Sequence, residues 1–308
     1  MNPQTPPMIF HGKYYLNHNP SKSIPHITKH NFHATKHLTS IQQSEQQTNK
    51  TQLLTATAPA TAPIPAKVVF PASFSLSSKY TLNVLDQGAL GSCVATSYAG
   101  IINALYDKNL SRLYSYYNAR VGTGNPPNQD TGLDLLQSWP IFRSFGIVPE
   151  SNWAYITSNY STIPPFATTY KIADTSIMPT IQSISQTDDS IKTVLNNGSF
   201  VTLGIYVYSS FMTPTVARNG IIPMPNTKTE RLSGGHCIHI VGWCTYNKTT
   251  YYIIRNSWGL GWGNDGNPNP TKAFVNNGKN GGFAYIPTAY VLNTKIAFEL
   301  IAIGKVTN

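Results

Sequence analysis

The chain has 308 residues, of which 41% are hydrophobic and 11% aromatic, enough to fill the core of one large or two modest globular domains. Basic side chains outnumber acidic ones by 22 to 12, but the sequence has neither zinc-finger spacing nor an RNP-type aromatic motif. It also lacks a run of 18 apolar residues and the apolar core of a signal peptide. These features favour a globular protein that is not a membrane protein, and they disfavour nucleic acid as its partner.

Residues 1–68 differ in composition from the remainder. They hold six of the eight histidines and six lysines against one acidic residue, Glu45. The segment closes in an Ala-, Thr- and Pro-rich stretch of the kind found in linkers. The sequence therefore predicts a boundary near Val68, between an N-terminal segment of residues 1–68 and a packed domain of residues 69–308.

The packed domain begins with helical patterns and ends with strand patterns. Apolar residues recur at helical spacing over 93–107, with Ser92 as the expected N-cap, and further helices are predicted over 132–145 and 188–196. β-branched and aromatic runs predict strands over 200–208, 237–246, 249–257 and 281–291. Helices followed by strands predict an α+β fold of two lobes, helical from about 80 to 200 and β from 201 to 300.

Cys93 is one of only three cysteines, and it stands at the start of the first predicted helix. The positive end of the helix dipole favours a thiolate there, and the thiolate is the nucleophilic form of cysteine. The alternative is a small buried hydrophobic residue beside the helix start. An odd, sparse set of cysteines is unlike a disulfide framework and suits a reducing compartment.

Three other side chains could complete a nucleophilic site. His236 follows two glycines at the start of an apolar strand, and Asn256 ends the next strand, where its amide could orient an imidazole. Gln87 lies six residues before Cys93, so its amide could join the Cys93 backbone N–H in stabilising an oxyanion. Together these residues predict acyl-transfer chemistry on a thiol.

Four ordered blocks carry a resemblance to a known family. They are PASFSLSSKYTLNVLDQGALGSCVA, GIVPESNWAY, SGGHCIHIVGW and NSWGLGWG. The chain resembles the papain-like (cathepsin-type) cysteine proteases from about residue 69 to 300. His236 follows Cys93 by 143 residues and Asn256 follows it by 163, which is close to the spacing of that family's Cys-His-Asn triad.

The resemblance implies a two-lobed papain-like fold, with a helical lobe, an antiparallel β-barrel-like lobe and the active-site cleft between them. It implies Cys93 as nucleophile, His236 as general base and then acid, Asn256 as the orienting residue and Gln87 as oxyanion donor. The residues that fall where the family binds an extended peptide are Gly91, Thr131, Gly132, Gly235 and, as a hydrophobic wall, Trp262. No cofactor or metal is required.

Two departures from the family pattern stand out. Leu90 and Val94 replace a disulfide-forming cysteine and a tryptophan beside the nucleophile, and residues 264–280 interrupt the run to the final strand. That insertion could shape the leaving-group side of the cleft, although a solvated loop is favoured. Cys237, His239 and Cys244 could suggest a metal site, but strand alternation favours core packing, because residues 237 and 239 share one face and 236 takes the other.

The N-terminal segment has a candidate role of its own. Histidines and lysines over 29–37 would share one helical face, which gains charge as the pH falls through about 6.5. A solvated face is the simpler interpretation. The alternative is a pro-segment that covers the cleft as an intramolecular inhibitor, since proteases of the resembled family are commonly made as zymogens.

The predicted function is that of a cysteine endopeptidase acting on peptide or protein substrates. An endopeptidase is favoured over an exopeptidase, because the sequence shows no inserted loop before Gly132 with a histidine pair that could bind a carboxy terminus. The alternatives are a non-catalytic peptide-binding relative, a basic structural or nucleic-acid-associated protein, and an enzyme that transfers the acyl group to an amine. The expected location is cytoplasmic or virion-associated.

Overall fold

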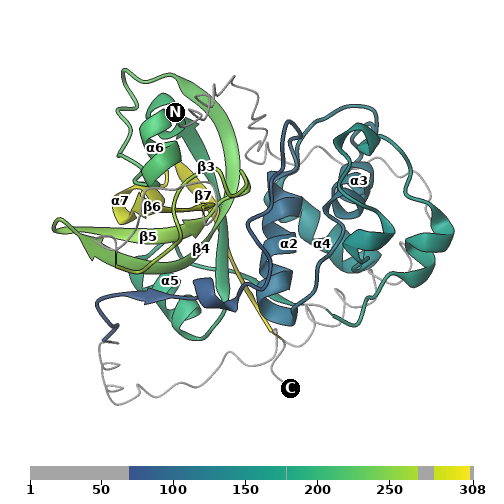
Figure 1. Ribbon diagram of the computed structural model, residues 1–308, viewed down its shortest axis with the longest axis horizontal. Helices are drawn as coiled ribbons and strands as arrows, with labels where there is room; N and C mark the ends of the chain where they lie inside the picture. The colour runs from purple at the N-terminus through teal and green to yellow at the C-terminus, as the bar shows by residue number, and fades with distance from the viewer. Residues whose placement is uncertain (1–68, 178, 270–280, 306–308) are drawn as a thin grey trace, which may run out of the picture. The chain divides into compact units, whose positions relative to one another are not determined.

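The computed structural model describes residues 69–177, 179–269 and 281–305 (Figure 1). The predictions for residues 1–68, including the 29–37 face, and for most of the 264–280 insertion lie outside these ranges. The described residues from Phe70 onward belong to one compact unit. Within the described ranges, the helices are all too short or too polar to cross a bilayer.

Three helices follow one another in the first half of this unit: α2 (Cys93–Tyr106), α3 (Arg112–Gly122) and α4 (Leu135–Phe145). Ser111 and Asp134 begin α3 and α4, because each side chain accepts a hydrogen bond from a backbone N–H of the first turn. Gly146 ends α4 with a φ of 73°, a conformation that favours glycine. Twelve of the fourteen α2 residues are buried, because α2 contacts both α3 and the sheet (Figure 1).

The sequence predicted α2 and α4 closely but not α3. Nine of the eleven α3 residues are buried, and Ser115, Asn118 and Arg120 are among them. The residues of α3 are on average much more polar than those of α2, so α3 lacks the largely apolar run that marked α2 in the sequence.

The strands form one antiparallel sheet in the order β2-β7-β3-β4-β5-β6, and β1 pairs with β4. The strands are β1 (Phe74–Ser75), β2 (Thr180–Ser183), β3 (Phe200–Tyr208), β4 (Leu232–Tyr246), β5 (Thr249–Arg255), β6 (Phe283–Pro287) and β7 (Ala297–Gly304). Helices α5 (Asp188–Asn196), α6 (Pro214–Asn219) and α7 (Thr288–Val291) accompany it. Short 3-10 helices are Ser77–Lys79, Glu150–Asn152, Thr157–Asn159, Phe166–Thr168, Tyr170–Ile172 and Ser209–Met212.

The predicted lobe boundary at residues 200 and 201 is too late. Strand β2 pairs with β7, with Thr180 opposite Gly304, and α5 packs against β3 and β4. The sheet half of the unit therefore begins near residue 180. All four β2 residues are exposed, so β2 lacks the apolar alternation that would have marked it in the sequence.

A single apolar core joins the helices to the sheet. On the helical side, Tyr98 of α2 stacks on Phe142 of α4 with ring centroids 4.6 Å apart. On the sheet side, Trp243 of β4 stacks on Phe74 at 4.8 Å. Because α2 packs directly on β4, the start of α2 and the first half of β4 are held in fixed relation.

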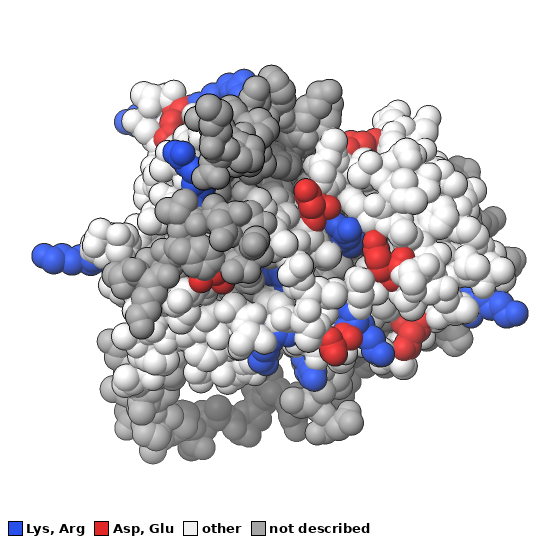
Figure 2. All heavy atoms as spheres, in the orientation of Figure 1, with Lys and Arg blue, Asp and Glu red and all other residues white. Residues whose placement is uncertain are grey.

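On the face shown in Figure 2, the charged side chains of the described residues are few, and several Lys or Arg lie beside Asp or Glu near the middle of the view. A nucleic-acid interface instead concentrates basic residues in a patch or stripe. The mixed surface visible in Figure 2 has none of that character.

Candidate active site

Cys93 is the first residue of α2 and is fully buried. The residue before it, Ser92, occupies the N-cap position but makes no side-chain capping bond. Its hydroxyl instead lies 2.5 Å from Tyr155 Oη. Ser92 is therefore the N-cap by position, as predicted, but its side chain contacts Tyr155 and makes no capping hydrogen bond to the first turn of α2.

The thiol of Cys93 lies against β4. Burial raises the pKa of Cys93 to about 11, and the backbone N–H groups of Cys237 and Val94 oppose that rise by hydrogen bonding to the sulfur. The helix start was expected to lower this pKa, but desolvation is the larger effect. Because the Cys237 N–H reaches the sulfur, Cys93 lies next to the backbone of His236, the residue before Cys237.

His236 is fully buried on β4 and is oriented by Asn256, which follows β5. His236 Nε2 lies 2.7 Å from Asn256 Oδ1, and this oxygen also accepts from the Ser257 backbone N–H at 2.8 Å. The amide oxygen can only accept, so Nε2 carries a hydrogen and the basic lone pair of the neutral ring is on Nδ1. Trp258 stacks on the imidazole with centroids 5.0 Å apart.

Gln87 is fully buried and fixed through both ends of its side-chain amide. Its Oε1 accepts from Ser257 Oγ at 2.5 Å, and its Nε2 donates to Leu90 O at 2.8 Å. An amide nitrogen has two hydrogens, so Nε2 can donate a second bond. The Gln87 backbone N–H also donates to Ser257 O at 2.8 Å, which ties this loop to the end of β5.

The structure brings two of the predicted groove residues together. A Cβ atom on Gly91 would lie 3.2 Å from Gly132 Cα, so the two glycines allow a close backbone approach. The Gly91 N–H donates to the Asp130 carboxylate at 3.1 and 3.0 Å, and Gly132 N lies 3.3 Å from Tyr116 Oη. These N–H groups are therefore engaged within the chain. Thr131 lies between Asp130 and Gly132.

The other two predicted groove residues lie on the sheet side. Gly235 belongs to β4 and pairs with Tyr206 of β3, directly before His236. Trp262 stacks on Phe211 with centroids 5.8 Å apart, and its ring meets that of Trp258 edge-on at 5.2 Å. Trp262 therefore belongs to an aromatic group that reaches the His236 imidazole through Trp258.

Sequence reasoning missed Ser257 and Tyr155. Ser257 orients the Gln87 amide, and Tyr155 contacts both Ser92 and the Gln87 backbone. Both residues lie inside blocks that carry the resemblance, NSWGLGWG and GIVPESNWAY, but a block does not reveal which of its members touch the site.

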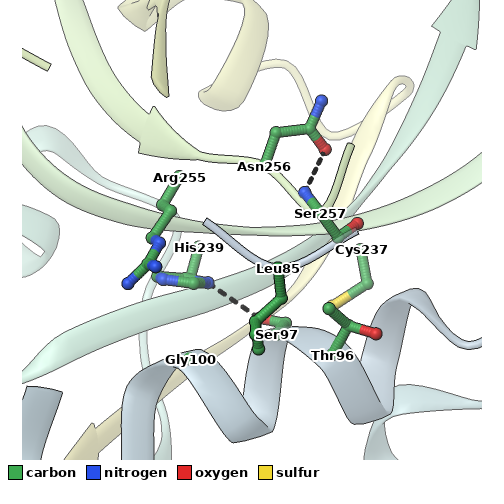
Figure 3. A pocket seen from close by; sticks show the side chains of 9 residues that line it. All are labelled: Leu85, Thr96, Ser97, Gly100, Cys237, His239, Arg255, Asn256 and Ser257. Atoms are coloured by element: carbon green, nitrogen blue, oxygen red, sulfur yellow. Dashed lines mark hydrogen bonds between the residues drawn. The ribbon is translucent and has the colours of Figure 1, made fainter. Parts of the chain in front are cut away.

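His239 has structural partners within the core. Its Nδ1 lies 3.0 Å from Ser97 Oγ (Figure 3). Its Nε2 lies 2.7 Å from Tyr80 Oη. Burial, together with the charge of Arg255, holds the pKa of His239 well below its ordinary value. Thr202 Oγ1 lies 3.4 Å from Cys237 Sγ. Among the residues that the structure describes, no three potential metal ligands cluster.

The fold and this thiol, imidazole and amide together are those of a cysteine-type peptidase. The model of the papain family of cysteine proteases matches residues 70–277, which is more than half of the chain. The chain therefore belongs to the papain family.

Similar proteins agree with this assignment. An uncharacterized peptidase C1-like protein of Acanthamoeba polyphaga mimivirus is 28% identical over 242 residues, 74% of this chain and 71% of that protein. A cathepsin L-like proteinase of Fasciola hepatica is 26% identical over 192 residues, 61% of this chain, which spans only 56% of that relative.

Solved structures show the same fold. The cysteine protease xylellain from Xylella fastidiosa aligns with a TM-score of 0.66 and 26% identity over 78% of this chain and 88% of its own. Digestive procathepsin L 3 of Tenebrio molitor aligns with a TM-score of 0.55 and 19% identity over 78% of this chain and 72% of its own. At that identity the likeness shows the fold alone.

Proposed function

We propose that this protein is a cysteine endopeptidase that hydrolyses peptide bonds through a thioester on Cys93. The observation that carries the proposal is the 2.7 Å bond between His236 Nε2 and Asn256 Oδ1, beside a sulfur that accepts the Cys237 backbone N–H. This bond places the basic lone pair of His236 on Nδ1, the nitrogen that must take the thiol proton.

The first step is proton transfer coupled to attack. Burial raises the pKa of Cys93 to about 11, so the thiolate forms only as its proton passes to His236 and an imidazolium balances the charge. The sulfur then attacks the carbonyl carbon of the peptide. The oxyanion accepts hydrogen bonds from Gln87 Nε2 and the Cys93 backbone N–H.

The remaining steps use the same groups in reverse. The His236 imidazolium gives its proton to the departing amine, which leaves the acyl group on Cys93 as a thioester. A water molecule then loses a proton to His236 and attacks the thioester carbonyl. Collapse of that intermediate releases the carboxylic acid and returns the proton to the Cys93 sulfur.

An extended peptide would lie along Gly91, Thr131, Gly132 and Gly235, with Trp262 as an apolar wall beyond the scissile bond. Support comes from the adjacency of Gly91 and Gly132 and from the contact of Trp262 with Trp258. The N–H groups of Gly91 and Gly132 are engaged within the chain, so their carbonyl oxygens are the backbone groups proposed to meet substrate. Gly132 O already accepts from Thr131 Oγ1 at 3.3 Å and would use its second lone pair.

The N-terminal segment, residues 1–68, is proposed to keep the enzyme inactive until it is removed or displaced. Its histidine-rich, basic composition supports this role. Two of the solved structures with this fold are of pro-forms, procathepsin L 3 of Tenebrio molitor and a procathepsin B of Trypanosoma congolense. The mimivirus relative supports a viral setting, either cytoplasmic or virion-associated.

The test is covalent labelling by a vinyl-sulfone peptide, together with hydrolysis of a fluorogenic peptide. We expect labelling at Cys93 alone. Cys237 and Cys244 are internal controls, because burial raises both of their pKa values and the proposed mechanism gives neither of them a base comparable to His236. Cys93→Ala should lose labelling and lower the rate of hydrolysis by at least about a thousandfold.

Three outcomes would count against hydrolysis at Cys93. Equal labelling of all three cysteines would mean that Cys93 is not activated. Labelling without hydrolysis would favour a peptide-binding relative. A product that carries an added amine in place of water would identify acyl transfer, so the assay includes an amine and the products are weighed by mass spectrometry.

A further inference from the structure

We propose that Tyr155 is a positioning residue for the oxyanion hole, whose hydroxyl fixes the loop from Gln87 to Ser92 so that Gln87 Nε2 faces the developing negative charge. This inference rests on the proposed function. It assigns a role to a residue of the helical half of the unit whose hydroxyl bonds to Gln87 O and Ser92 Oγ, and not to the Cys93 sulfur or the His236 ring.

The hydroxyl of Tyr155 joins the two ends of this loop. Tyr155 Oη donates to Gln87 O at 2.9 Å and lies 2.5 Å from Ser92 Oγ. A phenol has one hydrogen, and the carbonyl oxygen of Gln87 can only accept it. The Ser92 hydroxyl is therefore the donor in the second bond. One oxygen atom thus links the backbone of Gln87 to the residue before Cys93.

Tyr155 is itself held in place. The Arg112 guanidinium lies 3.7 Å above its ring, and the Tyr155 backbone N–H donates to Glu150 Oε1 at 2.7 Å. Arg112 Nη1 also donates to Asp86 O at 2.8 Å, so the same arginine supports the residue before Gln87. Burial raises the pKa of Tyr155 to about 12, which keeps its hydroxyl protonated across the ordinary assay range.

Gln87 is therefore anchored from both halves of the unit. Ser257, at the end of β5, sets the direction of its side-chain amide through Oε1, and Tyr155 sets its backbone through the carbonyl oxygen. Removing the tyrosine hydroxyl would leave that carbonyl without this donor and free the loop to shift. A small displacement of a preorganised oxyanion donor is costly, because the bond must be aimed at the transition state.

The experiment compares Tyr155→Phe with Tyr170→Phe, a matched control. Tyr170→Phe removes one hydroxyl bond, to Asn118 Oδ1 at 2.9 Å, whereas Tyr155→Phe removes the bonds to Gln87 O and Ser92 Oγ. Tyr170 lies away from the loop. For Tyr155→Phe we expect kcat on a peptide substrate to fall about tenfold with KM changed less than twofold. The rate of Cys93 alkylation by iodoacetamide and the Tm should stay close to wild type, since alkylation needs no oxyanion hole.

A double-mutant cycle with Gln87→Ala separates positioning from a general structural role. If Tyr155 acts through Gln87, Tyr155→Phe should cost less than twofold in kcat when Gln87 is already alanine. Ser92→Ala, which removes the Ser92 bond and keeps the bond to Gln87, should lower kcat less than Tyr155→Phe does.

The outcomes distinguish the two proposals. A wild-type protein that neither hydrolyses peptides nor labels at Cys93 contradicts the proposed function. An active wild type with an unchanged Tyr155→Phe overturns the positioning role. The same tenfold loss in the Gln87→Ala background also overturns it, as does an unfolded Tyr155→Phe variant, because the hydroxyl would then serve stability.

Discussion

The amide of Asn256 determines how the His236 ring is oriented, because its oxygen accepts from Nε2 at 2.7 Å. Asn256→Ala removes this acceptor, and Asn256→Asp keeps an oxygen in the same place. We expect kcat to fall by about ten- to a hundredfold in Asn256→Ala and by less in Asn256→Asp. Steady-state kinetics on both variants would check this, and equal losses in the two would contradict an orienting role for the oxygen.

His239 is a second residue whose effect follows from its surroundings. It is buried between Ser97 and Tyr80, near Arg255, and its pKa is held well below the ordinary value of about 6.5. Below that pH the unfolded chain binds a proton at this residue and the folded chain does not. The free energy of unfolding should therefore fall as the pH drops below about 6.5, and His239 adds nothing to the slope above it.

His239→Gln provides the comparison, because glutamine keeps hydrogen-bonding groups but does not titrate. Between pH 7.5 and 5.5 the wild type should lose about 1.4 kcal/mol more of its unfolding free energy than the variant. Urea denaturation at the two pH values measures this difference. Parallel losses would mean that His239 titrates normally in the folded state.

At the scale of elements, the antiparallel pairing of β1 with β4 depends on Gly242. Ser75 pairs with Gly242, and a Cβ atom there would lie only 2.1 Å from Phe74 O. Gly242→Ala should therefore displace β1 and disturb the stacking of Phe74 on Trp243. We expect a loss of about 1–3 kcal/mol in the free energy of unfolding, measured by urea denaturation. An unchanged stability would show that β1 contributes little to the fold.

At the scale of the whole molecule, the proposed role of residues 1–68 can be tested without deleting them. A specific protease site placed between Lys67 and Val69 allows the full chain to be cut after it has folded. If the segment covers the cleft, cutting should raise peptide hydrolysis by about tenfold or more where the cut segment is released. The assay is run at neutral and acidic pH, because protonation of the histidines should favour release.

The control is the same chain with Cys93→Ala, which should be cut but remain inactive. Equal activity before and after cutting, at both pH values, would contradict an inhibitory segment. The six histidines would then belong to a solvated face, the simpler of the two interpretations.

Much of the candidate site was predictable from local sequence. The helix of Cys93 has a clear apolar period, and His236, Asn256 and Gln87 each lie in a block that resembles the papain family. The strand runs that became β3, β4 and β5 are rich in β-branched and aromatic residues, and most of their residues are buried. Such signals lie within one element, so they can be recognised before the chain is folded.

Other features arise only when distant segments meet. Strand β2 is polar and exposed, and it is defined by its pairing with β7. Helix α3 was not predicted because its residues are polar on average, although most of them are buried. The pKa of Cys93 rises where the helix start alone predicted a fall, because desolvation depends on everything that packs around the sulfur.

The sequence by itself determined the family, and it predicted which thiol and which three polar side chains form the candidate site, since these depend on residue type, order and spacing. Tertiary structure alone decided that the Ser92 hydroxyl bonds to Tyr155 and makes no capping bond to α2. It also decided that Ser257 binds the side chain of Gln87 and Tyr155 its backbone carbonyl. The physical reason is that hydrogen bonds act over about 3 Å in space, and no local pattern reports which distant residues will come that close.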